Sequence, residues 1–371
     1  MTQPGQQGSV TLVAVGDVSL GDHPMCVGRG IASQLKRFGA ERPAYPFEHV
    51  GPLFEGADLV FGNLETALGN HNLRPAEIQS VEMRGPDDGA ARLRAAGFTV
   101  VNIANNHILQ HGREAFAATV AALEQQGIAV VGVKQPERPA TQPAVLERGG
   151  VLMAFLGYAF ESDRYFAGTP LYAFGPSCDI PAEVRAARDR ADVVVCSMHW
   201  GDEFIRYPSR AMRALGHAAI DAGAHAVLGH HPHVFHGVEA YRDGVIAYSL
   251  GNFAFDMLWD PALRTGLALR LTLTARGVSS VQSQFVTMSD DFQPVPVAPA
   301  SSRPLMDEVA ELTARVLDSP TDAEYAREYA ALVSRNRRQS YTHVLRHATH
   351  YPPGTLATIL ARPIMRRLRR Q

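Results

Sequence analysis

The stretch Ala224-His225-Ala226-Val227-Leu228-Gly229-His230-His231-Pro232-His233 places three histidines within four residues, directly after an apolar run. The apolar run predicts a buried strand, so the histidines lie at its carboxyl end. In an open α/β sheet, ligands bind in the crevice beyond the carboxyl ends of the strands. His231 and His233 have the alternate spacing with which two imidazoles reach one ion from an extended loop. The stretch therefore favours a metal site over a polar loop whose histidines only bond neighbouring backbone.

The composition is that of an ordinary folded chain without a global charge. Of the 371 residues, 46% are hydrophobic and 19% are charged, which suffices for one large α/β domain or two smaller ones. The formal net charge of -2 gives no overall attraction to nucleic acid or membrane, and we expect no nucleic-acid partner. Cys26, Cys178 and Cys196 are odd in number and widely spaced, which favours a reducing compartment over a disulfide framework.

The amino terminus carries no targeting signal that we can identify. Residues 1–8 are polar and rich in Gln and Gly, and we expect them to be disordered. No apolar run reaches the roughly 18 residues of a transmembrane helix. We therefore expect a cytoplasmic protein, with membrane association left open.

Strand and helix patterns alternate along most of the chain, which is typical of a layered α/β fold. Short β-branched or apolar runs predict strands at 10–15, 59–61, 98–104, 128–131, 144–147, 151–157, 192–197, 224–228 and 245–250. Amphipathic patterns predict helices at about 87–96, 112–126, 182–191 and 209–222. Gly149 and Gly150 predict a hairpin between two of the strands. The Gly- and Pro-rich segment 161–181 is expected to be a loop over one face.

The carboxy-terminal part of the chain reads differently. Residues 266–274 and 278–288 alternate in polarity and predict an antiparallel pair, after which the proline-rich segment 291–304 predicts a linker. Only helical patterns follow, at about 305–317, 322–338 and 356–370. The expected organisation is a disordered 1–8, a main domain at 9–290, a linker at 291–304 and a basic helical extension at 305–371.

Ligand-type side chains recur at or just after the predicted strand ends: Asp17, Glu65, Asn106, His107, His199, His231 and His233. Taken singly, each has a commoner explanation as a turn, a cap or a solvated side chain. Together they supply carboxylate, amide and imidazole groups, a mixture that suits one or two divalent cations such as Mn²⁺, Fe or Zn²⁺. The sequence contains neither a G-x-S-x-G motif nor a P-loop, which disfavours a serine hydrolase and P-loop ATP binding.

Six ordered motifs resemble those of the capsule-biosynthesis protein family CapA, named for poly-γ-glutamate synthesis. They are Gly16-Asp17-Val18, Gly62-Asn63-Leu64-Glu65-Thr66, Ala104-Asn105-Asn106-His107, Met198-His199-Trp200-Gly201-Asp202-Glu203, Gly229-His230-His231-Pro232-His233 and Ser249-Leu250-Gly251-Asn252-Phe253. The resemblance covers about residues 10–286. It implies the α/β fold of the calcineurin-like metallophosphatases, a four-layer αββα sandwich with a dinuclear metal site at the strand ends.

The resemblance also implies roles for individual residues. Asp17 would be a ligand of one metal, Glu65 the bridging carboxylate and Asn106 a ligand of the second metal. His107 would be the general acid that protonates a leaving group. His199, His231 and His233 would complete the coordination, with His230 as an alternative to His231. The expected substrate-pocket residues are Asn105, Trp200, Glu203, Asn252 and Phe253, although core packing explains Trp200 and Phe253 equally well.

Two positions depart from the pattern that the resemblance implies. Metallophosphatases carry a histidine where this chain has Ser19, so a site with one metal stays open and His23 is the candidate replacement. The CapA family commonly carries an aspartate where this chain has Gln110. Without that carboxylate beside it, the charged form of His107 is less favoured.

Three function classes follow. The first is a metal-dependent hydrolase that acts on a phosphoester or γ-glutamyl-type amide through a metal-bound hydroxide, related to poly-γ-glutamate or envelope polymer biosynthesis. The second is a metal-dependent amide-forming or anionic-polymer-binding biosynthetic protein without hydrolase activity, including one of secondary metabolism. The third is a scaffold that has lost its metals. In the first two, the expected partner is an anionic small molecule or polymer.

The extreme carboxy terminus is strongly basic. Residues 335–371 contain nine arginines and no acidic residue. Such a segment predicts weak contact with an anionic membrane surface, or the holding of an acidic polymer near the active site. The alternative is a solvated helix packed against the main domain, broken or kinked at Pro363.

Overall fold

Strand β1 (Ser9–Val18) lies in the middle of the larger of two main sheets in this computed structural model. The structure describes residues 8–134, 141–161, 171–318 and 320–368, so the expected disordered segment 1–8 lies almost wholly outside the described residues. β1 is buried along nearly all of its length because it is covered on both faces, as its continuous apolar run predicts.

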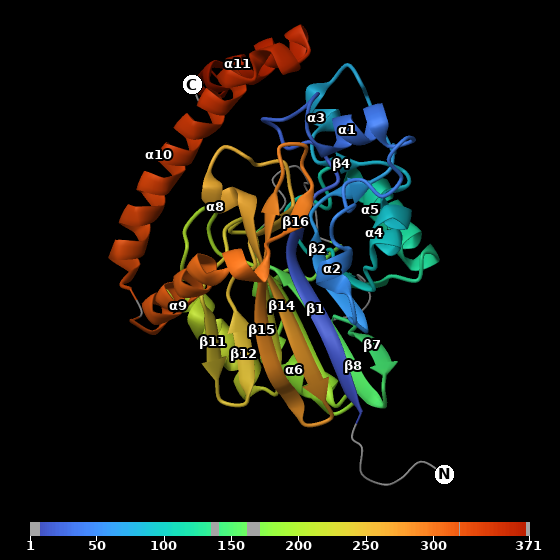
Figure 1. Cartoon of the computed structure of the whole chain (residues 1–371), viewed down its shortest axis with the longest axis vertical. Coiled ribbons are helices and arrows are strands. Elements are labelled where there is room, and N and C mark those ends of the chain that lie inside the picture. Colours follow the sequence, from blue (N-terminus) through green and yellow to red (C-terminus); the bar gives the residue numbers. More distant parts are fainter. Residues whose placement is uncertain (1–7, 135–140, 162–170, 319, 369–371) are drawn as a thin grey trace.

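The larger sheet combines parallel and antiparallel strands (Figure 1). β1, β2, β5 and β6 are parallel, whereas β14, β15 and β16 are antiparallel and β13 pairs with the carboxyl end of β1. The strands, in spatial order, are β16 (Pro294–Pro296), β15 (Gly277–Met288), β14 (Thr265–Thr274), β1, β2 (Leu59–Leu64), β5 (Val100–Asn102) and β6 (Ala129–Val131), with β13 (Asn252–Ala254) beside β1. The carboxyl ends of β1, β2 and β5 therefore meet at one edge.

The smaller sheet is parallel at its centre and antiparallel at both edges. Its strands are, in order, β11 (Val238–Tyr241), β12 (Gly244–Ala247), β10 (Ala226–His230), β9 (Val193–His199), β8 (Val151–Ala159) and β7 (Ala144–Arg148). The predicted hairpin across Gly149 and Gly150 is confirmed, since β7 and β8 pair in antiparallel register. β9 and β10 end side by side, with His199 opposite His230.

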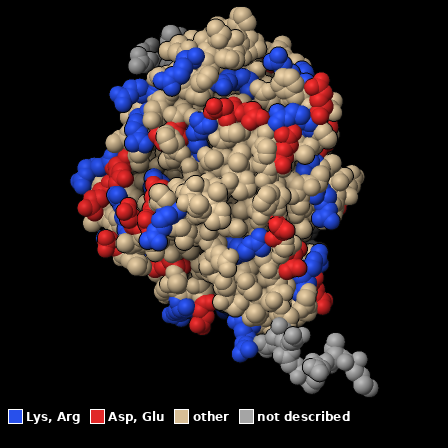
Figure 2. Space-filling model, viewed as in Figure 1, with Lys and Arg blue, Asp and Glu red and all other residues tan. Residues whose placement is uncertain are grey.

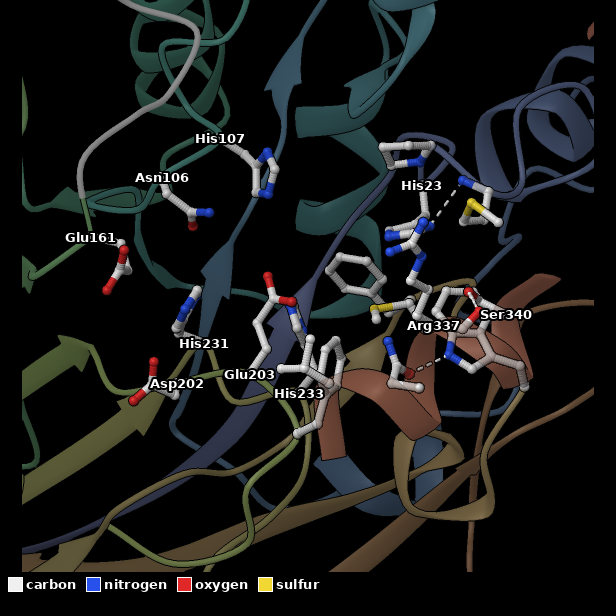
Figure 3. A pocket seen from close by; sticks show the side chains of 18 of the residues that line it. His23, Asn106, His107, Glu161, Asp202, Glu203, His231, His233, Arg337 and Ser340 are labelled. Atoms are coloured by element: carbon white, nitrogen blue, oxygen red, sulfur yellow. Dashed lines mark hydrogen bonds between the residues drawn. The ribbon is translucent and has the colours of Figure 1, made fainter. Parts of the chain in front are cut away.

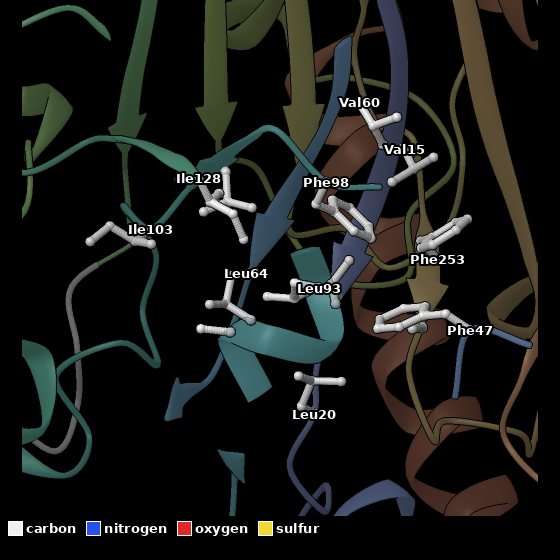
Figure 4. Close-up of a cluster of buried hydrophobic side chains, with 14 of the residues drawn as sticks. Val15, Leu20, Phe47, Val60, Leu64, Leu93, Phe98, Ile103, Ile128 and Phe253 are labelled. Atoms are coloured by element: carbon white, nitrogen blue, oxygen red, sulfur yellow. The ribbon is translucent and has the colours of Figure 1, made fainter. Parts of the chain in front are cut away.

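The two sheets pack face to face with helices on both outer sides, which confirms the expected four-layer αββα sandwich. Between the sheets, the rings of Phe61 and Phe155 stack with centroids 6.0 Å apart. Outside the larger sheet, Leu93, Phe98 and Phe253 belong to an apolar cluster beneath the helices (Figure 4). Those helices are α1 (Ile31–Phe38), α2 (Gly51–Phe54), α4 (Gly89–Ala96) and α5 (Gly112–Gln125), and the smaller sheet is covered by α6 (Ile180–Arg188) and α7 (Arg210–Asp221).

The expected linker at 291–304 is corrected by the structure. Residues 294–296 form β16, an edge strand in which Val295 pairs with Thr287 of β15. Prolines lack the backbone donor of an inner strand but are tolerated at a sheet edge, so Pro294 and Pro296 do not prevent pairing. The remaining short elements are β3 (Ala67–Leu68), β4 (Arg84–Gly85), α3 (Ile78–Val81) and α8 (Pro261–Arg264), together with 3-10 turns at 175–177, 299–301 and 348–350.

Three helices complete the chain: α9 (Arg303–Asp318), α10 (Asp322–Arg346) and α11 (Pro353–Leu368). A capping box of Thr321 and Glu324 starts α10. Figure 1 shows α10 and α11 along one flank of the sandwich. The expected break at Pro363 does not occur, because α11 continues to Leu368. Among the described residues, no helix has the length and apolarity needed to cross a bilayer, and the cytoplasmic location stays a prediction.

Candidate metal centre

The strand ends of both sheets deliver the predicted ligands to one place. Asp17 is the residue before the last in β1, Glu65 directly follows β2, and His199 is the last residue of β9. Asn106 and His107 come from the loop after β5, and His231 and His233 from the loop after β10. All seven residues that the sequence singled out are brought together, because parallel strands of both sheets end at the same edge of the sandwich.

The first group of ligand-type atoms contains Glu65, His199 and His231, with one atom of each lying within 4.8 Å of the others. His199 Nε2 is 3.1 Å from His231 Nδ1 and 3.7 Å from Glu65 Oε1. Asn106 adds its Oδ1, at 2.8 Å from His199 Nε2. Four side chains thus direct unlike donor atoms towards a common point.

The second group contains Asp17, Glu65 and His233, again with one atom of each within 4.8 Å of the others. His233 Nδ1 is 3.5 Å from Asp17 Oδ2, and its Nε2 is 3.9 Å from Glu65 Oε1. His230 lies beside this group, with Nδ1 3.5 Å from Asp17 Oδ1. His231, rather than the alternative His230, belongs to one of the two groups found among the described residues.

Glu65 is shared by both groups and accepts no hydrogen bond from the described residues. Its side chain is fully buried, and neither carboxylate oxygen has a hydrogen-bond partner among the described residues. Burial, followed by the negative charges of Asp17 and Glu203, raises the pKa of Glu65 well above its usual range. Because a buried carboxylate without donors is costly, this one fits a bound cation. The carboxylate, amide and imidazole donors around it suit a divalent transition metal.

The neighbouring ligands are held in the protonation states that metal binding requires. Burial alone would raise the pKa of Asp17, but His230, His233 and Asn63 together lower it, so this carboxylate is ionised. Burial and the adjacent His231 lower the pKa of His199 well below its usual range, which keeps that imidazole neutral.

The histidine loop after β10 has strained backbone. His231 and His233 have positive φ angles of 93° and 59°. A non-glycine residue in such a region costs on the order of 1–3 kcal/mol, and the strain persists only where surrounding contacts hold it. One such contact is the His231 backbone N–H, which donates to Asp17 Oδ2 at 3.1 Å. The backbone conformation that directs the two imidazoles inwards therefore reduces the stability of the folded protein.

Gly16 allows the close strand approach on which the site depends. A Cβ atom at this position would lie 1.9 Å from the carbonyl oxygen of Gly251, so a side chain would separate β1 from β13. These two strands place Asp17 beside Asn252. Asn252 Oδ1 in turn contacts His233 Nδ1 at 2.9 Å.

His107 lies at the rim of the two groups. Its Nε2 is 4.0 Å from Glu65 Oε1, and its side chain is 18% exposed. Nδ1 lies 2.9 Å from Gln110 Oε1, a contact in which Nδ1–H donates when that nitrogen carries the proton. Gln110 therefore occupies the orienting position beside His107, and it does so without the charge of an aspartate.

A cavity of about 610 Å³ opens beside the metal centre (Figure 3). Its metal-centre wall consists of Asn106, His107, Glu203, His231 and His233. Its C-terminal wall consists of Tyr329, Val333, Asn336, Arg337, Ser340, Tyr341 and Arg362, all from α10 and α11. The helical extension that the sequence predicts after a linker thus forms part of the pocket.

Of the five expected pocket residues, only Glu203 lines the cavity. The other four are buried in the protein and do not line it. Trp200 packs in the core outside the smaller sheet, with Nε1–H donating to the Tyr248 carbonyl at 2.9 Å. Phe253 packs in the core outside the larger sheet, which also corrects its assignment to the pocket. Asn105 donates to the Leu64 carbonyl at 2.8 Å, and buried Asn252 supports His233 as described above.

Sequence reasoning missed Asn63, the residue that ties the ligands together. Its Nδ2 lies 2.8 Å from Asp17 Oδ1 and 3.3 Å from His199 Nδ1. It stands two residues before Glu65 at the end of a predicted strand, and that position was an available signal. His23, the candidate replacement for a ligand at Ser19, belongs to neither group of described residues; its Nδ1 accepts a hydrogen bond from the Met25 N–H at 3.1 Å.

Comparison with known proteins gives one consistent family. The family described as "Bacterial capsule synthesis protein PGA_cap" matches residues 11–257. The capsule biosynthesis protein CapA of Bacillus anthracis is 31% identical over 263 residues, covering 67% of this chain and 61% of that protein. The PGA biosynthesis protein CapA of Bacillus subtilis is 33% identical over 250 residues, covering 66% and 63%. The chain therefore spans about three fifths of the length of these relatives.

Solved structures give weaker likenesses. A 5'-nucleotidase from Candida albicans has 10% identity and a TM-score of 0.44, covering 92% of this chain and 60% of that one. The sulfate thiohydrolase SoxB of Thermus thermophilus has 13% identity and a TM-score of 0.42, covering 85% and 62%. Likeness at these scores carries no argument about the site.

Proposed function

The chain belongs to the bacterial capsule synthesis protein family, and from that premise we propose that it is a metal-dependent hydrolase of a γ-glutamyl-type amide or a phosphoester. The observation that carries this proposal is Glu65, a buried carboxylate with no hydrogen-bond partner among the described residues and shared by two groups of ligand-type atoms. A carboxylate in that position suits a pair of cations better than one.

The two groups divide the ligands between two sites. Asp17, Glu65 and His233 would hold one cation, with His230 available beside them. Glu65, Asn106, His199 and His231 would hold the other. Divalent cations such as Mn²⁺, Fe or Zn²⁺ at such sites supply Lewis-acid activation of an anionic or carbonyl substrate and lower the pKa of water.

His107 supplies the proton that a leaving group needs. With Nδ1–H donating to Gln110 Oε1, Nε2 on the side of Glu65 would be the nitrogen that takes up and releases the proton. An amine or alkoxide leaving group requires such a donor near neutral pH. Because Gln110 is uncharged, it orients the ring without stabilising the imidazolium ion, so the charged form of His107 is favoured less than it would be beside an aspartate.

The substrate class in this proposal follows the names of the relatives. Two relatives are named for capsule or PGA biosynthesis, and a Mycobacterium tuberculosis relative, 29% identical over 214 residues, is named a probable polyglutamine synthesis accessory protein. An anionic glutamyl chain is therefore the first substrate to test. The cavity beside the metal centre, at about 610 Å³, has room for a segment of such a chain.

The test is turnover by full-length protein before and after metal removal. Chelated protein and protein reloaded with Mn²⁺, Fe²⁺ or Zn²⁺ are assayed against γ-glutamyl amides and phosphoesters. We expect turnover of at least one class by reloaded protein only. Equal rates with and without metal would contradict the proposal, as would the absence of turnover in a protein shown to hold its metals.

A second candidate function is a metal-dependent protein that forms amides or binds an anionic polymer without hydrolysing it. The relatives favour it because their names refer to biosynthesis. Reloaded protein that binds poly-γ-glutamate but leaves its length distribution unchanged would support this candidate over the hydrolase.

A further inference from the structure

The C-terminal wall presents one face of α10 to the cavity. Its lining residues Tyr329, Val333, Asn336, Arg337, Ser340 and Tyr341 recur at intervals of about one helical turn. The family match ends at residue 257, so this wall belongs to a part of the chain outside it. Figure 2 shows basic and acidic side chains mixed along the edge that α10 forms.

The arginines around this wall differ in how they are paired. Arg335 forms an ion pair with Asp260 at 2.9 Å, and Arg362 pairs with Glu82 and donates to the Pro24 carbonyl. The Arg337 side chain, by contrast, has no hydrogen bond or ion pair with any residue that the structure describes, and it lines the cavity. Its charge is therefore available to a ligand.

Arg337 and the metal-centre wall lie on different sides of the same cavity. Figure 3 shows Arg337 and Ser340 together on one side, with Asn106, His231 and Asp202 on the other. Phe255, Met257 and Trp259 also line the cavity and supply apolar surface. Trp259 is fixed by its Nε1–H, which donates to Asn336 Oδ1 at 2.5 Å and joins the apolar surface to α10.

We propose that Arg337 binds a carboxylate of the substrate at a distance from the reacting group, which lies at the metal centre. This inference rests on the proposed function and specifies its substrate class: an anion with a second carboxylate, joined to the reacting group by an aliphatic segment. A guanidinium forms paired hydrogen bonds with a carboxylate, which gives orientation as well as affinity. Arg337 is thus a substrate-binding residue supplied by the extension.

The experiment measures binding, so it does not require turnover. The probe is γ-glutamyl-γ-glutamate, and its partner probe has both carboxylates of the second residue converted to amides. Dissociation constants are measured calorimetrically with Mn²⁺-loaded full-length protein, for wild type, Arg337→Gln and Arg338→Gln. Arg338 is the matched control, because it is the adjacent exposed arginine and does not line the cavity.

We expect wild type and Arg338→Gln to prefer the carboxylate probe by on the order of 10-fold or more, the usual worth of a charged hydrogen bond. Arg337→Gln is expected to lose that preference while keeping its melting temperature. Equal preference in the two variants, or no preference in wild type, would overturn the inference. Failure of the proposed function shows separately, as absent metal or absent metal-dependent turnover.

Discussion

The metal-centre wall and the C-terminal wall of the cavity hold their polar side chains in different ways. Asp17, Glu65 and His199, behind the first wall, are fully buried at strand ends, and Asp17 and His199 contact Asn63 and Asn106 at 2.8 Å. Arg337, on the second wall, is exposed on a helix and makes no polar contact with the described residues. The first wall holds buried polar groups, whereas the second presents an exposed charge that no described side chain engages.

Under the proposed function, the metal-centre wall carries the chemistry and the C-terminal wall carries the selectivity for substrate. Buried carboxylates without donors are costly, so under the proposed function the geometry of the first wall is constrained by the cations it holds. Replacement of an exposed arginine costs little stability, so under the same proposal a helix outside the sandwich changes substrate selectivity without disturbing the metal centre.

Replacement of Glu65 by glutamine has the largest expected effect. The variant keeps the shape of the side chain but removes the charge shared by both groups, so we expect metal affinity to fall by at least about 100-fold and turnover to disappear. Equilibrium dialysis against Mn²⁺ measures the affinity. Glu203→Gln is the matched control and should keep its metals; equal metal affinity in the two variants would remove Glu65 from the centre.

His107→Ala should separate proton transfer from metal binding. We expect turnover to fall by roughly 100-fold or more while the metal content is unchanged, because the imidazole lies at the rim of the groups. Rates and metal content are measured on the same preparation, with exposed His49→Ala as the control. Loss of metal from His107→Ala would make it a ligand instead of a proton donor. His231→Ala and His233→Ala, by contrast, are expected to lose metal.

Ile359→Ala should loosen the C-terminal wall alone. Ile359 is buried with Val344 and Tyr351, and this cluster packs against Met25 of the sandwich. We expect about 2 kcal/mol less stability and faster hydrogen exchange in α10 and α11, with metal content unchanged. Leu345→Ala, at a position 59% exposed, is the control. A fall in metal content would show that the walls are coupled.

The smallest expected effect is on the pH dependence of stability, and it concerns the buried carboxyl group of Asp256. Burial, followed by the charge of Asp22, raises the pKa of Asp256 well above its usual range. The folded state thus binds the Asp256 proton more tightly than the unfolded state does. The free energy of unfolding of the protein therefore falls as pH rises above about 4, because Asp256 must then ionise in the folded state. Asp256→Asn should therefore gain stability relative to wild type between pH 4.5 and about 7.

Urea denaturation across that pH range measures the gain. Asp256 accepts hydrogen bonds from the backbone of His23, next to the Pro24 and Met25 carbonyls that contact α11 and Tyr351. Asp189→Asn, at an exposed carboxylate, serves as the control. A wild-type-like pH dependence in Asp256→Asn would show that Asp256 is ionised in the folded protein.

Local patterns in the sequence predicted a layered α/β domain, whereas the four-layer sandwich was implied by the resemblance to the CapA family. An apolar run gives a strand and the chain direction gives its end, so Asp17, Glu65 and His199 could each be placed at a strand end. The strand after Gly244 was extended too far: β12 ends at Ala247, and the chain crosses to the larger sheet before Asn252 begins β13.

What could not be predicted depends on packing between distant segments. Polarity patterns predicted α10, yet nothing in them indicates which face docks or that Arg337 reaches the cavity. Trp200 follows the predicted ligand His199 and Phe253 follows the pocket candidate Asn252, and only the packed layers show that both rings belong to the cores. Val295 is flanked by prolines, and the sequence therefore predicts a linker there. Only the structure shows that it pairs with β15.

The central claim is that Glu65 lies between two bound cations, and metal analysis of the full-length protein tests it most directly. Protein purified with Mn²⁺, Fe²⁺ and Zn²⁺ in the growth medium is analysed by inductively coupled plasma mass spectrometry, beside Glu65→Gln prepared in parallel. We expect about two transition-metal ions per wild-type chain and a large loss of metal in the Glu65→Gln variant. A wild-type protein without bound metal, or a variant that retains the same content, would contradict it.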